Sequence, residues 1–270
     1  MRPSTARAAR LLTSAAIAAV LALSVAGCTT TGNDTTGSIG ATDAPRSDSD
    51  WRRSLEVWGG RYRENPGDPD AAISYARALR ATDQRAQAVA VLEQASIRNP
   101  NNMPLLGAYG RALAEAGNYQ QALDALSHAH TPDQPDWRIL NAQGAVLDQM
   151  GRHAEAQRIY SAALKIVPNE PSVLSNLGLS YALIKDLKRA ETTLRHAVGQ
   201  PNANPKARQN LALVVGLQGR FAEAEKIARA DLPEDEAAGN VSYLRQMLSQ
   251  QSEWKKTGQQ PYVPPPDAGS

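Results

Sequence analysis

Cysteine and histidine, two residue types that can act as nucleophiles or metal ligands, are rare in this sequence. Cys28 is the only cysteine among 270 residues, so a disulfide could form only between two chains. His128 and His130 stand two positions apart near a predicted helix end, a spacing that directs them to different helix faces. His153 and His196 occupy positions that packing or solvent explains. We therefore expect no metal site built on histidine.

Sequence signatures of common catalytic sites are also missing. The chain has no glycine-rich phosphate loop, no G-x-S-x-G nucleophile turn and no H-E-x-x-H zinc motif. The sequence therefore predicts a protein that is not an enzyme and uses no cofactor, apart from a lipid covalently attached to Cys28.

The chemistry of Cys28 follows from the segment before it. Residues 1–10 carry three arginines and no acidic residue, and residues 11–25 contain only Leu, Ala, Val, Ile, Ser and Thr. This run is shorter than the roughly 20 apolar residues of a spanning helix and is typical of a signal peptide, here residues 1–27. Its end, VAGC, resembles the bacterial lipobox. The resemblance implies cleavage before Cys28 and acylation of its sulfur; an ordinary signal peptide that leaves an unpaired cysteine is the alternative.

Residues 28–50 are predicted to form a flexible, lipidated linker. They are rich in Gly, Thr, Ser and Asp, and Ile39 is their only large apolar residue, so they cannot bury enough surface to fold. Their root-mean-square span is about 26 Å. Thr29 stands where an aspartate favours retention in the inner membrane of enteric bacteria. We expect an outer-membrane protein on the periplasmic face, held to the membrane through its lipid anchor only.

The net charge gives no indication of nucleic-acid binding. The chain has 29 basic and 27 acidic residues, a formal charge of +2. Removal of residues 1–27 takes away three arginines and leaves 26 basic against 27 acidic residues, a charge of −1. A nucleic-acid footprint would need a dense basic patch on the folded part, so we expect no nucleic-acid partner.

A period of 34 residues organises the chain after the linker. Small and large residues recur at this interval: Ala88, Ala122, Ala156, Ala190 and Ala224; Ala95, Ala129, Ala163 and Ala197; Gly110, Gly144 and Gly178; Gly117, Gly151 and Gly219; and Leu92, Leu126, Tyr160 and Leu194. This pattern is the signature of the tetratricopeptide repeat (TPR). It predicts an all-α fold, a right-handed TPR superhelix (α-solenoid) of five repeats with flanking cap helices.

Each recurring residue has a structural reason. Small residues let the two helices of a unit approach closely, and a larger side chain fills the space beside them. Glycine permits the tight turn between the helices. Asp83 and Lys185 replace this glycine in two units, and Asp231 replaces an interior alanine in the last unit. We therefore expect the second helix of the fifth unit to be short or differently packed.

The repeat register also sets the domain boundaries. Residues 51–68 are predicted to be a second helix without its first, residues 69–233 to hold the five repeats, and residues 234–256 to form a helix that covers the open end. Residues 257–270 contain three consecutive prolines and are expected to form a disordered tail. A peptide-ligand role for this tail is the alternative.

The first helices of the units are expected to line a groove for a protein segment. This groove would be basic in its N-terminal half and would present amide and apolar groups in its C-terminal half. The predicted groove residues are Arg77, Arg80, Arg111, Arg138, Asn141, Asn176, Leu179, Gln209, Asn210 and Leu213. A solvated surface is the alternative for each. We expect an acidic or helical partner segment to dock at the arginines.

A more specific resemblance lies near the C-terminus. Residues 208–232, RQNLALVVGLQGRFAEAEKIARADL, and residues 240–248, NVSYLRQML, resemble the C-terminal part of the TadD-type lipoproteins of tight-adherence (Flp) pilus assembly. The lipobox, the linker and the repeat number fit the same family. The resemblance implies a pilotin-like assembly factor for the Tad pilus secretin, with the secretin and other pilus assembly components as partners.

Two other classes of function remain open on the sequence. A general periplasmic envelope scaffold would recruit cell-wall enzymes or other envelope proteins instead of a secretin. An enzyme or ligand-binding lipoprotein would need a buried pocket with clustered acids or histidines, which the repeat pattern does not predict.

Overall fold

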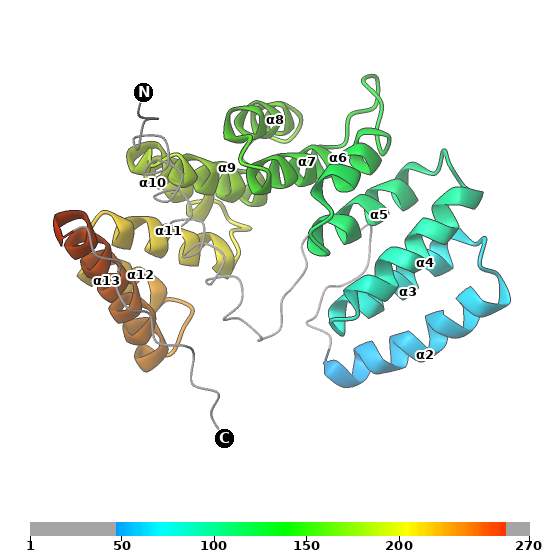
Figure 1. Cartoon of the computed structure of the whole chain (residues 1–270), viewed down its shortest axis with the longest axis horizontal. Helices are drawn as coiled ribbons and strands as arrows, with labels where there is room; N and C mark the ends of the chain where they lie inside the picture. Colours follow the sequence, from blue (N-terminus) through cyan, green and yellow to red (C-terminus); the bar gives the residue numbers. More distant parts are fainter. Residues whose placement is uncertain (1–46, 258–270) are drawn as a thin grey trace, which may run out of the picture.

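The computed structural model describes residues 47–257, and within this range the chain forms twelve helices and no β-strand. Helices α3 to α12 pair as five hairpins, one for each predicted repeat (Figure 1). The helices are α2 (Asp48–Glu64), α3 (Pro69–Ala81), α4 (Arg85–Arg98), α5 (Met103–Glu115), α6 (Tyr119–Ser127), α7 (Trp137–Gln149), α8 (His153–Ile166), α9 (Pro171–Leu183), α10 (Leu187–Val198), α11 (Pro205–Leu217), α12 (Phe221–Ala228) and α13 (Glu234–Thr257).

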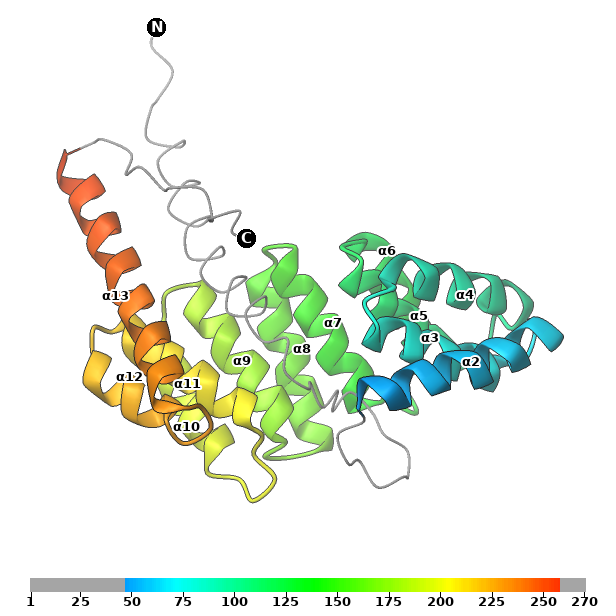
Figure 2. The same ribbon diagram turned by 90° about the horizontal axis from the view of Figure 1, so that it is seen from below.

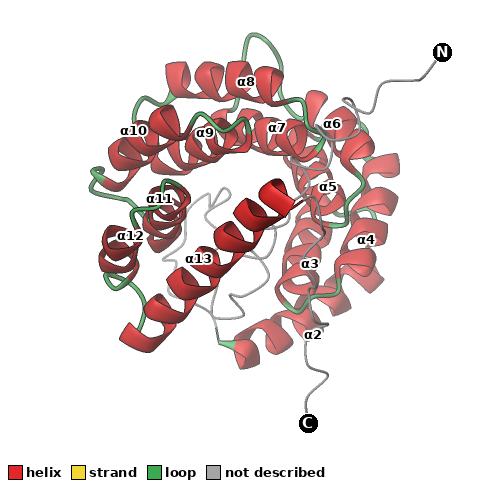
Figure 3. Cartoon of the chain, turned by 60° about the vertical axis from the view of Figure 1, so that its left-hand side comes forward, coloured by secondary structure: helices red, strands yellow, loops and turns green. Residues whose placement is uncertain are grey.

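The hairpins stack side by side into a curved solenoid of two layers. The first helices α3, α5, α7, α9 and α11 form the inner layer, and the second helices form the outer layer (Figure 3). From α5 on, each first helix contacts both helices of the preceding unit. The predicted all-α superhelix is therefore confirmed, and its inner layer consists of the five first helices.

A capping side chain at a 34-residue interval starts every first helix. Each accepts a hydrogen bond from a backbone N–H in the first turn and so satisfies a donor that the helix leaves unpaired. Proline follows directly in three of the five units, at a position where its missing N–H costs nothing. The capping residues are Asp68, Asn102, Asp136, Glu170 and Asn204.

Glycine in a first helix faces a large side chain of its own second helix, as the repeat pattern predicts. A Cβ atom on Gly144 would lie 2.4 Å from Cε1 of Tyr160, and Tyr160 itself is 1% exposed. Gly110 and Gly178 face leucines of their own second helices in the same way. The partner side chain therefore occupies the space that a side chain on the glycine would fill. This contact sets the distance between the paired helices.

The turns between paired helices all need a left-handed residue. Gly117, Gly151 and Gly219 have φ values of +82°, +74° and +82°. Asp83 and Lys185 adopt the same region with φ of 60° and 66°, although a side chain makes it less favourable there. The two predicted substitutions of the turn glycine thus change the residue without changing the turn.

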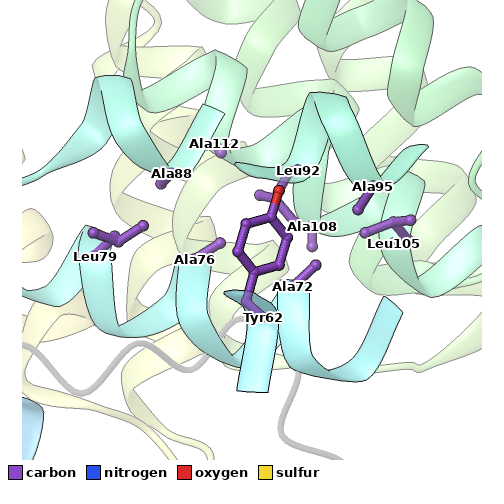
Figure 4. Packing of buried hydrophobic residues seen from close by; sticks show 10 residues of the cluster. All are labelled: Tyr62, Ala72, Ala76, Leu79, Ala88, Leu92, Ala95, Leu105, Ala108 and Ala112. Carbon is purple, nitrogen blue, oxygen red and sulfur yellow. The ribbon is translucent and has the colours of Figure 1, made fainter. Parts of the chain in front are cut away.

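Helix α2 begins three residues before the predicted boundary at residue 51. Ser47 caps it, because its hydroxyl accepts from the backbone N–H of Asp50 at 3.3 Å while the Asp50 carboxylate accepts from the N–H of Ser47 at 3.0 Å. This reciprocal capping stabilises a polar first turn that composition alone assigns to the linker. Helix α2 then packs on α3, and Tyr62 points into the cluster between α3 and α4 (Figure 4).

Helix α13 covers the other end of the solenoid. Its side chains Ala237, Val241 and Leu244 are buried, and it contacts both helices of the fifth unit, as the first helix of a sixth unit would. Helix α12 is the shortest of the twelve described helices, as expected. Asp231, which follows it, accepts two hydrogen bonds of 2.6 Å from Arg208 of α11. Aspartate in place of the interior alanine of the repeat therefore adds an ion pair with Arg208 within the last unit.

Several sequence predictions fall outside the described residues: the signal peptide 1–27, Cys28, the linker as far as residue 46, and the tail from residue 258. Between residues 47 and 257, no helix combines the length and the apolar composition that crossing a bilayer requires.

Close approach at Gly144 gives the first testable prediction. Gly144→Ala should lower the free energy of unfolding by about 1–3 kcal/mol, because the added methyl group overlaps the Tyr160 ring. Gly60→Ala in α2 is the matched control, since nothing lies within 4 Å of a Cβ there, and it should raise stability by about 0.5–1 kcal/mol. Urea denaturation followed by circular dichroism measures both; equal effects would contradict the packing described.

An ion cluster between the fourth and fifth units gives a pH prediction. Burial raises the pKa of Glu191, but hydrogen bonds from Gln218, Arg195 and Arg220 outweigh it and lower this pKa from 4.5 to about 2. A carboxyl with a depressed folded-state pKa stabilises the fold above its unfolded pKa and loses this contribution as pH falls. The stability difference between wild type and Glu191→Gln should therefore shrink by up to about 3 kcal/mol between pH 5 and pH 2.

The control for the pH series is Glu225→Gln. Glu225 pairs with Arg229 of the same segment at the surface, and such pairs contribute little. Loss of this pair should change the free energy of unfolding only slightly. A Glu191→Gln difference from wild type that does not change between pH 5 and pH 2 would show that the cluster does not hold this carboxylate in its charged form.

Candidate functional site

The ten predicted groove residues all lie on first helices, so the structure places them on the inner layer. They form two groups along this surface. Three arginines of the first two units meet at one pocket, while amide and leucine side chains of the later units lie along α7, α9 and α11.

Arg77, Arg80 and Arg111 line the same small pocket, which has a volume of about 30 Å³ and lies between α3 and α5. We call it the Arg111 pocket. Arg80 is neutralised by Glu115 of α5, whose carboxylate accepts from Arg80 Nε at 2.6 Å. Arg77 is exposed and makes no hydrogen bond or ion pair within the described part of the chain. The predicted basic half of the groove is thus a compact cluster centred on Arg111.

Arg111 differs from its neighbours because it is largely buried without a partner. Its Nε atom is shielded from solvent and has no hydrogen-bond partner among the described residues. Burial lowers the pKa of its guanidinium from 12.5 to about 10, and the positive charge of Arg80 lowers it further, against the opposing effect of Asp136 and Glu115. This side chain therefore stays charged at neutral pH at a cost that the surroundings do not offset.

Arg138, the fourth predicted arginine, does not join the pocket. It lies at the start of α7, where its guanidinium stacks on the ring of Trp137 at 4.6 Å from the ring centroid. Such stacking holds the side chain in place while leaving its donors free.

In the C-terminal half of the inner surface, side-chain hydrogen bonds join neighbouring first helices. Asn176 Nδ2 donates to Asn141 Oδ1 at 3.0 Å, and Asn210 Nδ2 donates to Ser175 Oγ at 2.8 Å. Each bond uses one donor of a partly exposed amide, while the acceptors Asn141 and Ser175 are themselves buried. Gln209, Leu179 and Leu213 are partly exposed on the same helices.

The third unit contains a buried polar cluster that the sequence analysis did not predict. Asp148 Oδ1 accepts from Ser180 Oγ at 2.8 Å and lies 2.8 Å from His153 Nδ1, while Oδ2 accepts from Tyr160 Oη at 3.1 Å. Burial raises the pKa of Asp148 despite these hydrogen bonds. The four residues connect α7, α8 and α9, so the cluster joins the third unit to the fourth.

A sequence signal for this cluster existed. Asp148 stands at the repeat position where the neighbouring units have Ala114, Ala182 and Gly216. A carboxylate in a row of small residues needs donors nearby, and His153 lies in the adjacent turn. His128 has a different role, since its Nδ1 lies 2.9 Å from the backbone oxygen of Asp124. Within residues 47–250, no three metal-ligating side chains lie close enough to hold a metal ion.

The Asp148 cluster yields a stability prediction. Asp148→Leu should lower the free energy of unfolding by about 2–4 kcal/mol, because it leaves the buried Ser180 and Tyr160 hydroxyls without their acceptor. Tyr160→Phe removes one donor and keeps the others satisfied, so it should cost about 1 kcal/mol. Urea unfolding measures both variants, and an Asp148→Leu protein as stable as wild type would disprove the role of the cluster.

Comparisons with known proteins agree with this architecture. The family model of the anaphase-promoting complex, cyclosome, subunit 3 matches residues 53–129, which hold most of α2 and the first two hairpins. No curated protein matches the chain in sequence.

Solved structures resemble the chain over most of its length. PilW, described as a widely conserved type IV pilus biogenesis factor, matches with a TM-score of 0.62 and 16% identity over 72% of this chain and 91% of PilW. The APC/C hetero-tetramer Cut9-Hcn1 matches with a TM-score of 0.59 and 15% identity over 72% of this chain and 37% of the other. The human IFIT1 dimer with PPP-AAAA matches with a TM-score of 0.56 and 15% identity over 78% and 52%.

The chain thus spans well under two thirds of the Cut9-Hcn1 and IFIT1 chains, and nearly all of PilW. Identities this low establish likeness of fold. Together with the five hairpins and the 34-residue register, they show that this chain has the fold of a tetratricopeptide-type α-solenoid.

Proposed function

We propose that this protein is a non-enzymatic scaffold that binds a segment of another protein along its inner surface. The observation that carries this proposal is the continuous inner layer of five first helices, which presents a basic cluster at one end and amide groups at the other. Solenoids of this kind offer a long concave surface of fixed side chains, and such a surface suits a peptide or helix. The partner class is therefore a protein.

We further propose that the scaffold is anchored to the outer membrane by lipid on Cys28 and faces the periplasm. The support is the sequence alone: a basic start, a short apolar run and the VAGC end that resembles a lipobox. The polar residues that follow Cys28 would let the solenoid reach past the membrane surface.

The finer proposal is that the protein is a pilotin-like assembly factor for a Tad/Flp pilus secretin. The resembling stretches, residues 208–232 and 240–248, form α11, α12 and the buried part of α13, which are the last repeat and its covering helix. PilW offers an example of a pilus biogenesis factor with a similar fold. Lipidation, a periplasmic position and a protein-binding solenoid together suit a protein that accompanies a secretin to the outer membrane.

The test compares wild type with Cys28→Ser in the bacterium that produces the protein. Wild type should fractionate with the outer membrane and co-purify with the secretin after gentle crosslinking. Cys28→Ser should leave the outer membrane and lower the amount of assembled secretin multimer several-fold. Thr29→Ser is the matched control, because it changes the neighbouring residue and keeps the thiol, and it should behave as wild type.

Two outcomes would overturn the finer proposal. Intact secretin rings and pili in the Cys28→Ser strain would show that the anchored protein does not assist assembly. Recovery of cell-wall enzymes in place of a secretin would identify a general envelope scaffold instead.

A further inference from the structure

The Arg111 pocket has a chemical feature that the scaffold itself does not need. In the described part of the chain, the Nε–H of Arg111 is shielded from solvent and has no hydrogen-bond partner, while the residue as a whole is partly exposed. Buried guanidinium groups that serve the fold are paired, because an unpaired buried charge destabilises the folded state. The position therefore lacks an anionic partner.

Neighbouring carboxylates do not supply that partner. Glu115, the nearest on the same helix, pairs with Arg80, and the Asp136 carboxylate accepts from the backbone N–H of Arg138 at 2.7 Å. Both raise the pKa of Arg111 only enough to offset part of the lowering by burial and by Arg80. With Arg77 exposed beside it, the pocket has an excess of positive charge.

The walls of the pocket limit what can enter. Ile73, Ala76, Leu92 and Ala108 form its apolar lining, and its volume of about 30 Å³ admits a group of a few atoms. A planar carboxylate matches the guanidinium fork and fits this size, and the methylene stem that carries it matches the apolar lining. A carboxylate carried on a short methylene stem is the end of a glutamate or aspartate side chain.

We propose that the Arg111 pocket binds the side-chain carboxylate of a glutamate or aspartate in a partner peptide. The inference rests on the proposed function, namely that the inner surface binds a protein segment, and it states which chemistry anchors that segment. The pocket is lined by residues of α3, α4 and α5. Helix α2 packs on α3, and helix α7 packs on α5 (Figures 1 and 2), so a peptide bound along the inner layer would continue past the pocket in both directions. An internal side chain suits this position better than a C-terminal carboxylate does.

The first experiment measures binding of defined peptides to the lipid-free mature chain, residues 28–270 with Cys28→Ser. Three 12-residue peptides of serine, alanine and leucine are used: one amidated with a central glutamate, one amidated with glutamine in its place, and one with glutamine and a free C-terminal carboxylate. The readout is the Nε–Hε resonance of Arg111, assigned by its loss in Arg111→Lys. The glutamate peptide should shift this resonance in a saturable way, and the glutamine peptide should not.

Two results of the titration would overturn the proposal. A response to the glutamine peptide equal to that of the glutamate peptide would exclude recognition of a carboxylate. A response only to the peptide with the free C-terminus would show that the pocket takes a chain end and not a side chain. Sodium chloride at matched ionic strength controls for unspecific screening.

The second experiment uses Arg111→Met, which keeps much of the volume and removes the charge. Because the guanidinium is unpaired in the free protein, this variant should unfold at a temperature about 2–4 °C higher than wild type while losing at least about 30-fold in affinity for the glutamate peptide. A lower unfolding temperature would assign Arg111 a structural role. Arg189→Met is the control, because Arg189 pairs with Asp186 and stacks on Tyr181 away from the pocket, and it should bind the peptide as wild type does.

The same variants separate this inference from the proposed function. If wild type co-purifies with the secretin and Arg111→Met does so equally, the pocket inference fails while the scaffold role stands. If no secretin is recovered with wild type but the glutamate peptide binds through Arg111, the pilus role fails and the pocket inference stands.

Discussion

In the three central units, a close contact between a glycine of the first helix and a large side chain of the second helix determines how the paired helices are held together. At Gly144 the Tyr160 ring occupies the volume that any other residue would claim. Because this contact holds each pair at a similar short distance, successive pairs have a similar shape and stack on one another in the same way. Curvature, the two layers and the row of first helices along the inner surface all follow from repeating this contact.

The 34-residue register predicted the helices well and the connections between units less well. The positions where helices pair closely can be predicted from recurring glycines, because the lack of a side chain can be read directly from the sequence: Gly110, Gly144 and Gly178. The capping residues recur at the same interval, as at Asp68 and Asn204, but their types vary between Asp, Asn and Glu, so they form a weaker pattern than the recurring small residues. The start of α2 was misplaced because Ser47 and Asp50 count as linker residues by composition and as a reciprocal cap by geometry.

Prediction of the candidate site was limited by a different cause. Sequence position placed the arginines on the right helices, since a residue's place in the repeat fixes its layer. It did not show that Glu115 neutralises Arg80 while Arg111 stays unpaired, or that Arg138 turns onto Trp137. The pairing of Arg80 with Glu115 depends on a contact between different units, and the stacking of Arg138 on Trp137 depends on side-chain conformation within one helix. The repeat pattern specifies neither. The Asp148 cluster belongs to the same kind, because its donors come from three helices.

The hydrogen bonds between neighbouring first helices have a mechanical consequence. Asn176 to Asn141, Asn210 to Ser175 and Arg80 to Glu115 each join residues 35 positions apart across the inner edge of the arc. Bending the arc straighter lengthens this edge first, so these bonds resist extension while the outer helices slide. A pull on the two ends of the solenoid would therefore act on these polar contacts in addition to the apolar packing between units.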